Sequence, residues 1–265
     1  MGCNNYAYVN GRFVPEAGAT VSIFDRGFLY GDGCFETMRV YGGRIFRAVE
    51  HLERLFDGLR ALEIEPSLSR EEMRAVCRVL IDRNSIAEGV ARIYVTRDSL
   101  IVTARRYTMQ PVDLRATISS VRIDPQLSRF KTANRLPYIL AQQEAVRAVV
   151  NDAVLLNTAG RVVEFTASNL FVVSGDELFT PPLTDGPLPG ITRHAVLTLA
   201  AELRIPAHEH SFSTEFLKNA AEVFATNSLM EITSVVTWTR WPKLTIKLKD
   251  AYRTLVTREL STLVP

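Results

Sequence analysis

Cysteine and histidine are both scarce in this sequence. Its 265 residues include three cysteines, Cys3, Cys34 and Cys77, and four histidines. The cysteines are too few and too scattered for a disulfide framework, and neither Cys-x-x-Cys nor His-x-x-x-His spacing occurs. We therefore expect no metal centre, because zinc sites need such closely spaced ligands. Few, scattered thiols are also typical of the reducing cytoplasm, which is the location that we predict.

A large excess of charge of one sign is absent too. The 31 lysines and arginines nearly balance the 29 aspartates and glutamates, so the net charge is only +2. This balance argues against nucleic acid or an anionic membrane surface as a partner. No apolar run approaches the length that spans a bilayer, and residues 1–6 lack the basic start and apolar stretch of a signal peptide. We expect small molecules as the partners.

What the sequence does contain is the composition of an ordinary globular protein, with 47% hydrophobic and 23% charged residues. Its length suits one large domain or two smaller ones. Alternating apolar residues predict strands, and apolar residues three or four positions apart predict helices. On these patterns we expect a short hairpin at 8–14, with Asn10-Gly11 as its turn, and strands at 34–41, 44–46, 91–96, 100–107, 116–121, 154–156, 162–173 and 222–226. We expect helices that begin near 49 and 69 or span 136–149, 190–203 and 250–260.

One segment interrupts this pattern. Residues 108–113, with the sequence TMQPVD, separate two halves that each mix strands and helices. We interpret the segment as a linker. The prediction is an α+β protein with two domains, residues 1–110 and residues 111–265.

Four polar features stand out, and each by itself has a functional and an ordinary explanation. Lys131 precedes an apolar helix and can serve as an amine nucleophile, although most lysines in such places are merely solvated. Glu164 lies in a strand-like run, where its carboxylate either faces solvent or is buried beside a cation. Residues 189–193 suit phosphate binding at a helix N-terminus or a plain N-cap, and residues 226–228 suit a turn or an anion site. Composition and spacing alone do not identify an enzyme.

Six blocks of sequence, taken together and in order, carry more information than any one of them. They are residues 25–36 (DRGFLYGDGCFE), 50–55 (EHLERL), 131–136 (KTANRL), 160–171 (GRVVEFTASNLF), 190–193 (GITR) and 226–233 (TNSLMEIT). In these blocks the chain resembles the class IV pyridoxal-phosphate enzymes, and the resemblance extends from Tyr8 to about Val236. This family contains branched-chain aminotransferases, D-amino acid aminotransferases and aminodeoxychorismate lyases.

The resemblance implies a particular fold and cofactor. The fold is the two-domain PLP fold type IV, similar to D-amino acid aminotransferase, with a smaller N-terminal α/β domain and a larger C-terminal domain. The implied cofactor is pyridoxal 5'-phosphate, lying between the two domains. Relatives commonly form homodimers, so we expect a homodimer here.

Roles for individual residues follow from the matching blocks. Lys131 would hold the cofactor as an internal aldimine, a Schiff base, and would then move the proton between Cα and C4′. Glu164 would pair with the pyridine nitrogen and keep it protonated, so that the ring withdraws electrons. Arg54 would clamp the phosphate as a charged fork. The rest of the phosphate site would come from the backbone N–H groups of Ile191 and Thr192, the Thr192 hydroxyl and Ser228.

By the same resemblance, the substrate pocket is lined by Tyr30, Phe35, Thr37, Arg39 and Leu229. Arg39 has two interpretations, since it either meets a substrate carboxylate or pairs with a nearby acid. The chain departs from the family after Arg97, where only two residues precede the next strand and relatives have a longer loop. Either the pocket is unusually open or the sequence omits a mobile segment, so we predict neither D nor L preference.

The resemblance is compatible with two reactions. We predict an aminotransferase that moves an amino group between an amino acid or amine and a 2-oxo acid. The alternative is an aminodeoxychorismate lyase that releases p-aminobenzoate and pyruvate from the same starting complex. A non-catalytic protein that binds pyridoxal phosphate is a distant third, because such a scaffold would not need the lysine.

Overall fold

The computed structural model describes residues 5–110 and 112–262 and divides into two compact units. Unit 1 comprises residues 1–109 and 130–135, and unit 2 comprises residues 110–129 and 136–265. Both units combine helices with a sheet, which confirms the predicted α+β class. The predicted boundary at 110/111 differs from this division mainly in the segment 130–135, which is hydrogen-bonded to a strand of unit 1. Pro111, in the predicted linker, lies outside the described residues.

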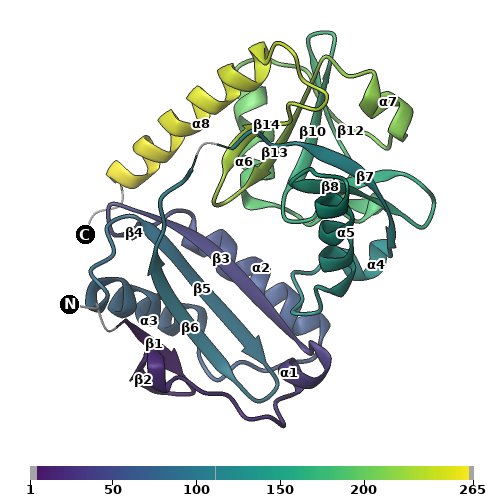
Figure 1. The fold of residues 1–265 in the computed structure, drawn as a ribbon. Helices are drawn as coiled ribbons and strands as arrows, with labels where there is room; N and C mark the ends of the chain where they lie inside the picture. The colour runs from purple at the N-terminus through teal and green to yellow at the C-terminus, as the bar shows by residue number, and fades with distance from the viewer. Residues whose placement is uncertain (1–4, 111, 263–265) are drawn as a thin grey trace. The chain divides into compact units, whose positions relative to one another are not determined.

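Unit 1 is built on one antiparallel sheet of six strands, in the order β2-β1-β6-β5-β3-β4 (Figure 1). The strands are β1 (Tyr6–Val9), β2 (Arg12–Pro15), β3 (Gly33–Tyr41), β4 (Arg44–Ile45), β5 (Gly89–Thr96) and β6 (Leu100–Arg106). The helices are α1 (Arg26–Tyr30), α2 (Ala48–Ala61) and α3 (Arg70–Arg83), with a short 3-10 turn at Glu16–Gly18.

The two long helices of unit 1 pack on one face of this sheet because helices and strands are both amphipathic. The helices contribute apolar side chains three or four positions apart, namely Leu52, Leu55 and Leu59 of α2 with Met73, Cys77 and Leu80 of α3. The strands contribute alternate residues such as Met38, Ile93 and Val102. A capping box between Ser69 and Glu72 begins α3, as the sequence indicates.

The other face of the same sheet carries the residues that alternate with this core. Phe35 and Thr37 of β3 lie directly opposite Tyr94 and Arg92 of β5. Because successive residues of a strand point to opposite sides, these four side chains share the face that α2 and α3 do not cover.

A glycine ahead of β3 brings residues 130–135 against unit 1. Gly31 ends α1 in the left-handed conformation, with φ 70°, and a Cβ atom there would lie 3.0 Å from Asn134 Cα. Only glycine combines a positive φ with so close an approach. The Gly-Asp-Gly run of the first sequence block therefore makes room for the segment that contains Lys131.

Unit 2 contains a sheet in which β12-β11-β10-β9-β8-β7 form one path and β13 pairs with both β10 and β14 (Figure 1). Its strands are β7 (Ala116–Ile123), β8 (Asp152–Asn157), β9 (Val162–Phe165), β10 (Asn169–Ser174), β11 (Glu177–Thr180), β12 (Ala207–Glu209), β13 (Glu222–Asn227) and β14 (Glu231–Ser234). The helices are α4 (Pro125–Ser128), α5 (Leu136–Arg147), α6 (Ile191–Glu202), α7 (Thr214–Lys218) and α8 (Lys243–Thr262), with a 3-10 turn at Leu183–Asp185.

Helices cover the sheet of unit 2, so its central strands are buried. Tyr138, Ala141 and Ala145 of α5 pack against residues of β8 and β9, and α6 and α8 lie next to β13. Every residue of β9 is buried, as is nearly every residue of β10 and β13. Polar side chains on these strands are therefore exceptional and need partners inside the protein.

Several elements differ from the sequence-based expectation. The single strand expected at 162–173 is two strands, β9 and β10, joined by a reversal in which Phe165 N donates to Ser168 O at 2.8 Å. Both strands are buried on both faces, so the run looked continuous. The elements α1, α4, α7, β11, β12 and β14 were not expected, and α8 begins at Lys243 rather than near 250. Within the described residues, no helix combines the length and the apolar character that crossing a bilayer requires.

Candidate active site

Lys131 lies on an extended segment that β3 holds in place. Phe35 N donates to Lys131 O at 3.0 Å, and Ala133 N donates to Gly33 O at 2.8 Å. These two bonds flank Thr132 and fix the backbone from Lys131 to Ala133. The Lys131 side chain therefore projects from an ordered strand-like segment of unit 1 and not from a free loop.

The amine of Lys131 lies over an aromatic ring. Its Nζ atom is 4.7 Å from the centroid of the Phe35 ring, and Phe35 stacks on Tyr94 with centroids 5.1 Å apart and ring planes at 12°. Phe35 is buried, whereas Lys131 is half-buried. Such a cation–π contact stabilises a charged amine and restricts the positions that the Lys131 side chain occupies. Unit 1 thus brings two predicted residues, Lys131 and Phe35, together.

Arg54 forms a bidentate ion pair with a buried carboxylate on the core face of the sheet. Its Nε donates to Glu36 Oε1 at 2.7 Å and its Nη2 donates to Glu36 Oε2 at 2.8 Å. His51, one turn earlier on α2, lies 2.8 Å from Glu36 Oε2 through Nδ1. The side chain of Glu36 is fully buried, so this carboxylate needs both partners. Two parallel bonds fix the plane of the guanidinium.

Charge and burial oppose each other in this cluster. Burial alone would raise the pKa of Glu36, but the charge of Arg54 and the hydrogen bonds from His51 and Arg54 hold it well below its usual range. The pKa of His51 is lowered, first by burial and then by the charges of Arg54 and Lys131, although the neighbouring Glu36 acts in the opposite direction. We assign an ionised Glu36 and a neutral His51. Since an ionised carboxylate only accepts, the Nδ1 atom of His51 carries the proton.

Arg39 has its terminal nitrogens occupied inside unit 1. Its Nη1 donates to the carbonyl oxygens of Gly89 at 3.0 Å and Tyr107 at 2.8 Å, and its Nη2 donates to Glu88 Oε2 at 2.8 Å. The guanidinium also lies over the rings of Tyr41 and Tyr107. Arg39 is 6% exposed. Of its two interpretations, this arrangement favours the pairing with a nearby acid.

Arg92, a residue that the sequence did not single out, lies on the open face of the sheet. It is exposed, and its Nε donates to Thr37 Oγ1 at 3.1 Å. Thr37, a predicted substrate residue, is therefore next to a cation. The signal for Arg92 was available, because it alternates with the buried Ala91 and Ile93 along β5.

The segment after Arg97 is a regular hairpin turn between β5 and β6. Thr96 N donates to Ser99 O at 2.8 Å, and Ser99 N donates to Thr96 Oγ1 at 2.8 Å. The strands pair up to Val95 and Leu100 without interruption. No missing segment is needed to connect these two strands.

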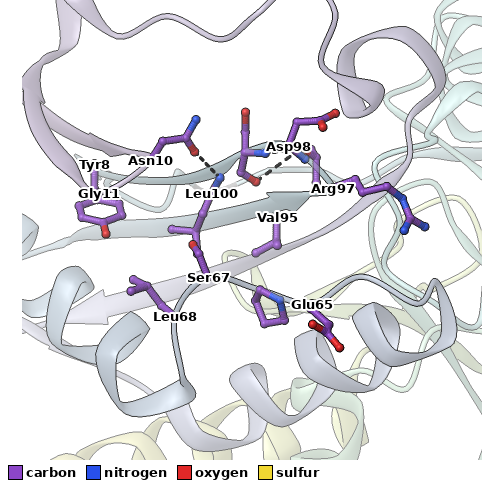
Figure 2. Close-up of a pocket in the computed structure, with 13 residues that line it drawn as sticks. Tyr8, Asn10, Gly11, Glu65, Ser67, Leu68, Val95, Arg97, Asp98 and Leu100 are labelled. Atoms are coloured by element: carbon purple, nitrogen blue, oxygen red, sulfur yellow. Dashed lines mark hydrogen bonds between the residues drawn. The ribbon is translucent and has the colours of Figure 1, made fainter.

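A cavity of about 430 Å³ opens beside this turn in unit 1 (Figure 2). Its walls come from the β1–β2 turn and from residues 65–68 and 95–100. Two of its polar side chains bind the protein itself: Asn10 Oδ1 accepts from Leu100 N at 2.7 Å, and both terminal nitrogens of Arg97 donate to backbone carbonyls. The lining residues include none of the predicted site residues. We do not place the active site there.

Glu164 is the carboxylate of the second group of site residues, in unit 2. It is 5% exposed and accepts hydrogen bonds from three groups. Its Oε2 accepts from Asn169 Nδ2 at 3.2 Å and from Leu188 N at 3.0 Å, and its Oε1 accepts from Tyr138 OH at 3.2 Å. These three donors are neutral groups, two from side chains and one from the backbone. Three donors stabilise the ionised form of a buried carboxylate.

The predicted phosphate site in unit 2 lies at the N-terminus of α6. Gly190 is the N-cap, which has no side chain to cap the helix, and Ile191 and Thr192 begin the first turn. The first N–H groups of a helix have no partner within it and attract anions. Arg193 fixes this turn, since its Nη2 donates to Pro181 O at 3.0 Å and also pairs with Glu209.

Ser228 and Leu229 lie in the turn between β13 and β14. Asn227 organises this turn, because its Oδ1 accepts from Leu229 N at 2.9 Å and from Met230 N at 2.7 Å. Its Nδ2 donates to Ser168 Oγ at 3.0 Å. The Thr-Asn-Ser run of the sequence is thus an ordered turn within unit 2.

The remaining predicted residue, Tyr30, lies on the surface of α1. It is 65% exposed, and the Arg26 guanidinium lies 5.2 Å from the centroid of its ring. The predicted residues therefore form two sets, one in each unit. Lys131, Arg54, Phe35, Thr37, Arg39 and Tyr30 belong to unit 1, and Glu164, Ile191, Thr192, Ser228 and Leu229 belong to unit 2.

Comparison with known proteins identifies the family. The model of the family described as amino-transferase class IV matches residues 33–238, which is most of the chain. The chain belongs to the class IV aminotransferases. An inferred branched-chain-amino-acid aminotransferase of Methanocaldococcus jannaschii is 35% identical over 277 residues, covering 95% of this chain and 96% of the relative. A D-alanine aminotransferase of Staphylococcus aureus is 31% identical, covering 86% of this chain and 87% of the relative.

Solved structures agree with this assignment. The branched-chain amino acid aminotransferase of Escherichia coli superimposes with a TM-score of 0.90 at 29% identity, covering 96% of this chain and 95% of that one. A related branched-chain amino acid aminotransferase that contains pyridoxamine 5'-phosphate superimposes with a TM-score of 0.88. The resemblance seen in the sequence and the predicted fold are confirmed. This class IV aminotransferase is an enzyme, and its activity is amino-group transfer, as predicted.

The sequence of this aminotransferase did not point to three residues that hold the site. They are Glu36, Tyr138 and Asn169. Glu36 carried a signal, since an acid at a core position of an alternating strand needs a buried partner. Asn169 carried a similar one, as an amide at the start of an apolar run.

Proposed function

We propose that this aminotransferase binds pyridoxal 5'-phosphate covalently through Lys131 and uses it to move an amino group from an amino acid or amine to a 2-oxo acid. The observation that carries the proposal is the Lys131 amine, held 4.7 Å from the Phe35 ring on a segment that β3 fixes. Family membership supports it, as does the pyridoxamine 5'-phosphate in a related structure.

The chemistry of the side chains fits this cofactor. An aldehyde needs an amine, which Lys131 supplies. A pyridinium nitrogen needs an anionic acceptor, which the buried Glu164 supplies. A phosphate needs cations and N–H donors, and Arg54 with the N-terminus of α6 supplies both.

Each residue then has a defined task. When bound, the cofactor supplies an electron sink for the charge that develops at the substrate Cα. Lys131 would bind the cofactor and, once released, would take the proton from Cα and deliver it to C4′ of the cofactor. Glu164 holds the proton on the ring nitrogen. Arg54, oriented by Glu36, binds the phosphate together with Ile191, Thr192 and Ser228.

For the substrate we propose Arg92 as the cation that meets a carboxylate. What supports this is exposure: Arg92 is exposed beside Thr37, while Arg39 is buried with its terminal nitrogens occupied. Phe35, Tyr30 and Leu229 remain our proposals for contacts with the rest of the substrate. The substrates that we propose are a small amino donor and a 2-oxo acid acceptor.

We also propose a homodimer and a cytoplasmic location. The dimer is supported by a cluster of exposed apolar side chains in unit 1, which includes Ile23, Phe24 and Phe28 at 69%, 77% and 69% exposure. Large exposed apolar patches mark contact surfaces. The location is supported by Cys34 and Cys77, which are both free and buried.

Half-reactions with single amino donors test the proposed function. The purified enzyme, loaded with pyridoxal phosphate, is mixed with L-leucine, D-alanine or a chiral amine, and the absorbance change to the aminated cofactor is followed. We expect one class of donor to convert the cofactor stoichiometrically, with the 2-oxo product detected by mass spectrometry. K131A should give no conversion with any donor.

The alternative activity is an outcome of the same experiment. If no donor converts the cofactor, and aminodeoxychorismate instead yields p-aminobenzoate without any amino acceptor, the enzyme is a lyase. Absence of both reactions from a protein that still binds the cofactor would support the non-catalytic alternative and contradict the proposal.

A further inference from the structure

Asn169 is a buried amide in unit 2 without a role in the proposed chemistry so far. It is 5% exposed and begins β10. Its Nδ2 atom donates to Glu164 Oε2 at 3.2 Å and to Leu188 O at 2.8 Å. Both N–H bonds of the amide are thus directed at acceptors, which settles its orientation.

Strand pairing places Asn169 beside Glu164. Asn169 lies directly opposite Glu164 of β9 on one side and opposite Thr226 of β13 on the other. Directly opposed residues of antiparallel strands point to the same face of the sheet. The three polar residues therefore form one row across three buried strands. Within this row Asn169 and Glu164 are joined by a hydrogen bond, whereas the buried Thr226 Oγ1 has no partner among the described residues.

The backbone of Leu188 closes this arrangement. Leu188 N donates to Glu164 Oε2 at 3.0 Å, while Leu188 O accepts from Asn169 at 2.8 Å. Glu164, Asn169 and Leu188 thus form a closed ring of three hydrogen bonds. Removing the amide leaves Leu188 O without this donor and leaves the Glu164 carboxylate one donor short.

The oxygen of the same amide lies close to the backbone of Gly190, the residue that precedes α6. A Cβ atom built on Gly190 would lie 1.9 Å from Asn169 Oδ1. The amide oxygen therefore occupies the space where any other residue at 190 would place its side chain. Gly190 is the N-cap of α6, so Asn169 touches both the carboxylate and the segment that leads to the predicted phosphate site.

We propose that Asn169 is the positioning residue for Glu164, holding its carboxylate ionised and fixed for the ring nitrogen of pyridoxal phosphate. The inference rests on the proposed function, because it assumes that Glu164 meets this nitrogen. Asn169 itself touches neither cofactor nor substrate in this role and acts through Glu164. Aspartate cannot replace it, since a carboxylate would face two acceptors, Glu164 Oε2 and Leu188 O.

The test compares two cofactors that differ only at the ring nitrogen. Dissociation constants are measured by fluorescence titration of the apoenzyme with pyridoxal phosphate and with its 1-deaza analogue, in which C–H replaces the nitrogen. For N169A we expect about tenfold weaker binding of pyridoxal phosphate, the effect of one lost hydrogen bond to a charged group. Binding of the deaza analogue should change less than about twofold, because it offers Glu164 no N–H group.

Asn157 gives a matched control. It is also a buried amide of unit 2, 3% exposed, and its Nδ2 donates to Asp185 O at 3.1 Å. N157A should affect both cofactors equally. If N169A folds too poorly to measure, the nearly isosteric N169D is used, with the same selective weakening expected.

The outcomes separate the two proposals. Equal weakening of both cofactors by the Asn169 variants, or no weakening at all, overturns the positioning role while leaving the proposed function intact. If the wild-type protein binds pyridoxal phosphate no better than the deaza analogue, Glu164 does not serve the nitrogen and the inference fails. If it binds neither, the proposed function fails as well.

Discussion

At the scale of single residues, burial distinguishes Arg39 of β3 from Arg92 of the neighbouring strand β5 and indicates which of them is available to a substrate. Arg39 is 6% exposed and its terminal nitrogens are used by the protein, whereas Arg92 is exposed beside Thr37. For R92Q we expect the KM for the amino donor to rise by about tenfold or more, because a charge-assisted bond to the carboxylate is lost. The kcat should change much less. Steady-state kinetics with saturating acceptor measures both.

Arg105 is the control for this prediction. It is exposed on the same face of the sheet and pairs with Glu16 near the far edge. R105Q should leave the KM unchanged. A normal KM for R92Q would contradict the proposed role of Arg92 and would return attention to Arg39.

His51 makes the stability of unit 1 depend on pH. The pKa of His51 is lowered in the folded state, mainly by burial. As the pH falls, His51 is therefore protonated in the unfolded chain before it is protonated in the folded chain. Stability must therefore fall as the pH drops below the ordinary histidine pKa of about 6.5. From pH 7.5 to 5.5 we expect this to cost about 1 kcal/mol of unfolding free energy. The lowered pKa of Glu36 acts only at still lower pH, since an unfolded glutamate titrates near a pH of about 4.3.

Urea denaturation at both pH values measures the effect. H51Q keeps a donor near Glu36 but cannot titrate, so its pH dependence should be smaller than that of the wild type by this amount. H194Q, at an exposed position of α6, is the control and should behave as the wild type does. An unchanged pH dependence in H51Q would contradict a neutral buried histidine.

At the scale of elements, the turn from α1 to β3 determines where Lys131 lies. G31A combines two costs: a positive φ of 70°, and a Cβ atom 3.0 Å from Asn134. We expect a loss of about 1–2 kcal/mol of stability from the φ angle alone. We also expect weaker cofactor binding, because the 130–135 segment must shift. Urea denaturation and cofactor titration measure the two effects.

A variant at Gly160 distinguishes the cost of the positive φ angle from the cost of the contact with Asn134. Its φ is 74°, nearly the same, but nothing lies within 4 Å of a Cβ atom there. G160A should lose similar stability and keep normal cofactor affinity. Equal cofactor affinity in both variants would mean that the contact with Asn134 does not hold the lysine segment.

The long elements could be predicted from the sequence because their periodicity reports burial on one side. The helices near 49 and 69 carry regular apolar stripes and became α2 and α3. Periodicity is lost where a strand is buried on both faces, which is why β9 and β10 were merged into one. Short elements such as α7 and β12 have too few residues to show any period.

The candidate site, like the fold, could be predicted from the sequence only in part. Residues within the matching blocks, such as Lys131 and Glu164, could be named from the family resemblance. Several of their pairings could not, because the partners are distant in sequence: Glu36 and Arg54 are 18 residues apart, and Glu164 and Leu188 are 24 apart. Only the pairing of strands and the packing of α2 bring these groups together.

At the scale of the whole molecule, the exposed apolar side chains of residues 23–30 predict self-association. Phe24 and Phe28 are 77% and 69% exposed. For the double variant F24E/F28E we expect the dimer to dissociate at micromolar concentration, because charges do not enter an apolar interface without cost. Sedimentation velocity measures the change. V149E alters an apolar residue of unit 2 that is 88% exposed and should leave the mass unchanged. A wild-type protein that sediments as a monomer would contradict the dimer.

The central claim is that Lys131 carries pyridoxal phosphate, and borohydride reduction tests it most directly. The whole enzyme is incubated with pyridoxal phosphate, reduced, digested and analysed by mass spectrometry. We predict a yellow protein whose label lies on the peptide containing Lys131, with K218A labelled like the wild type and K131A unlabelled. A colourless protein, or a label on other lysines while Lys131 stays unmodified, would contradict the account.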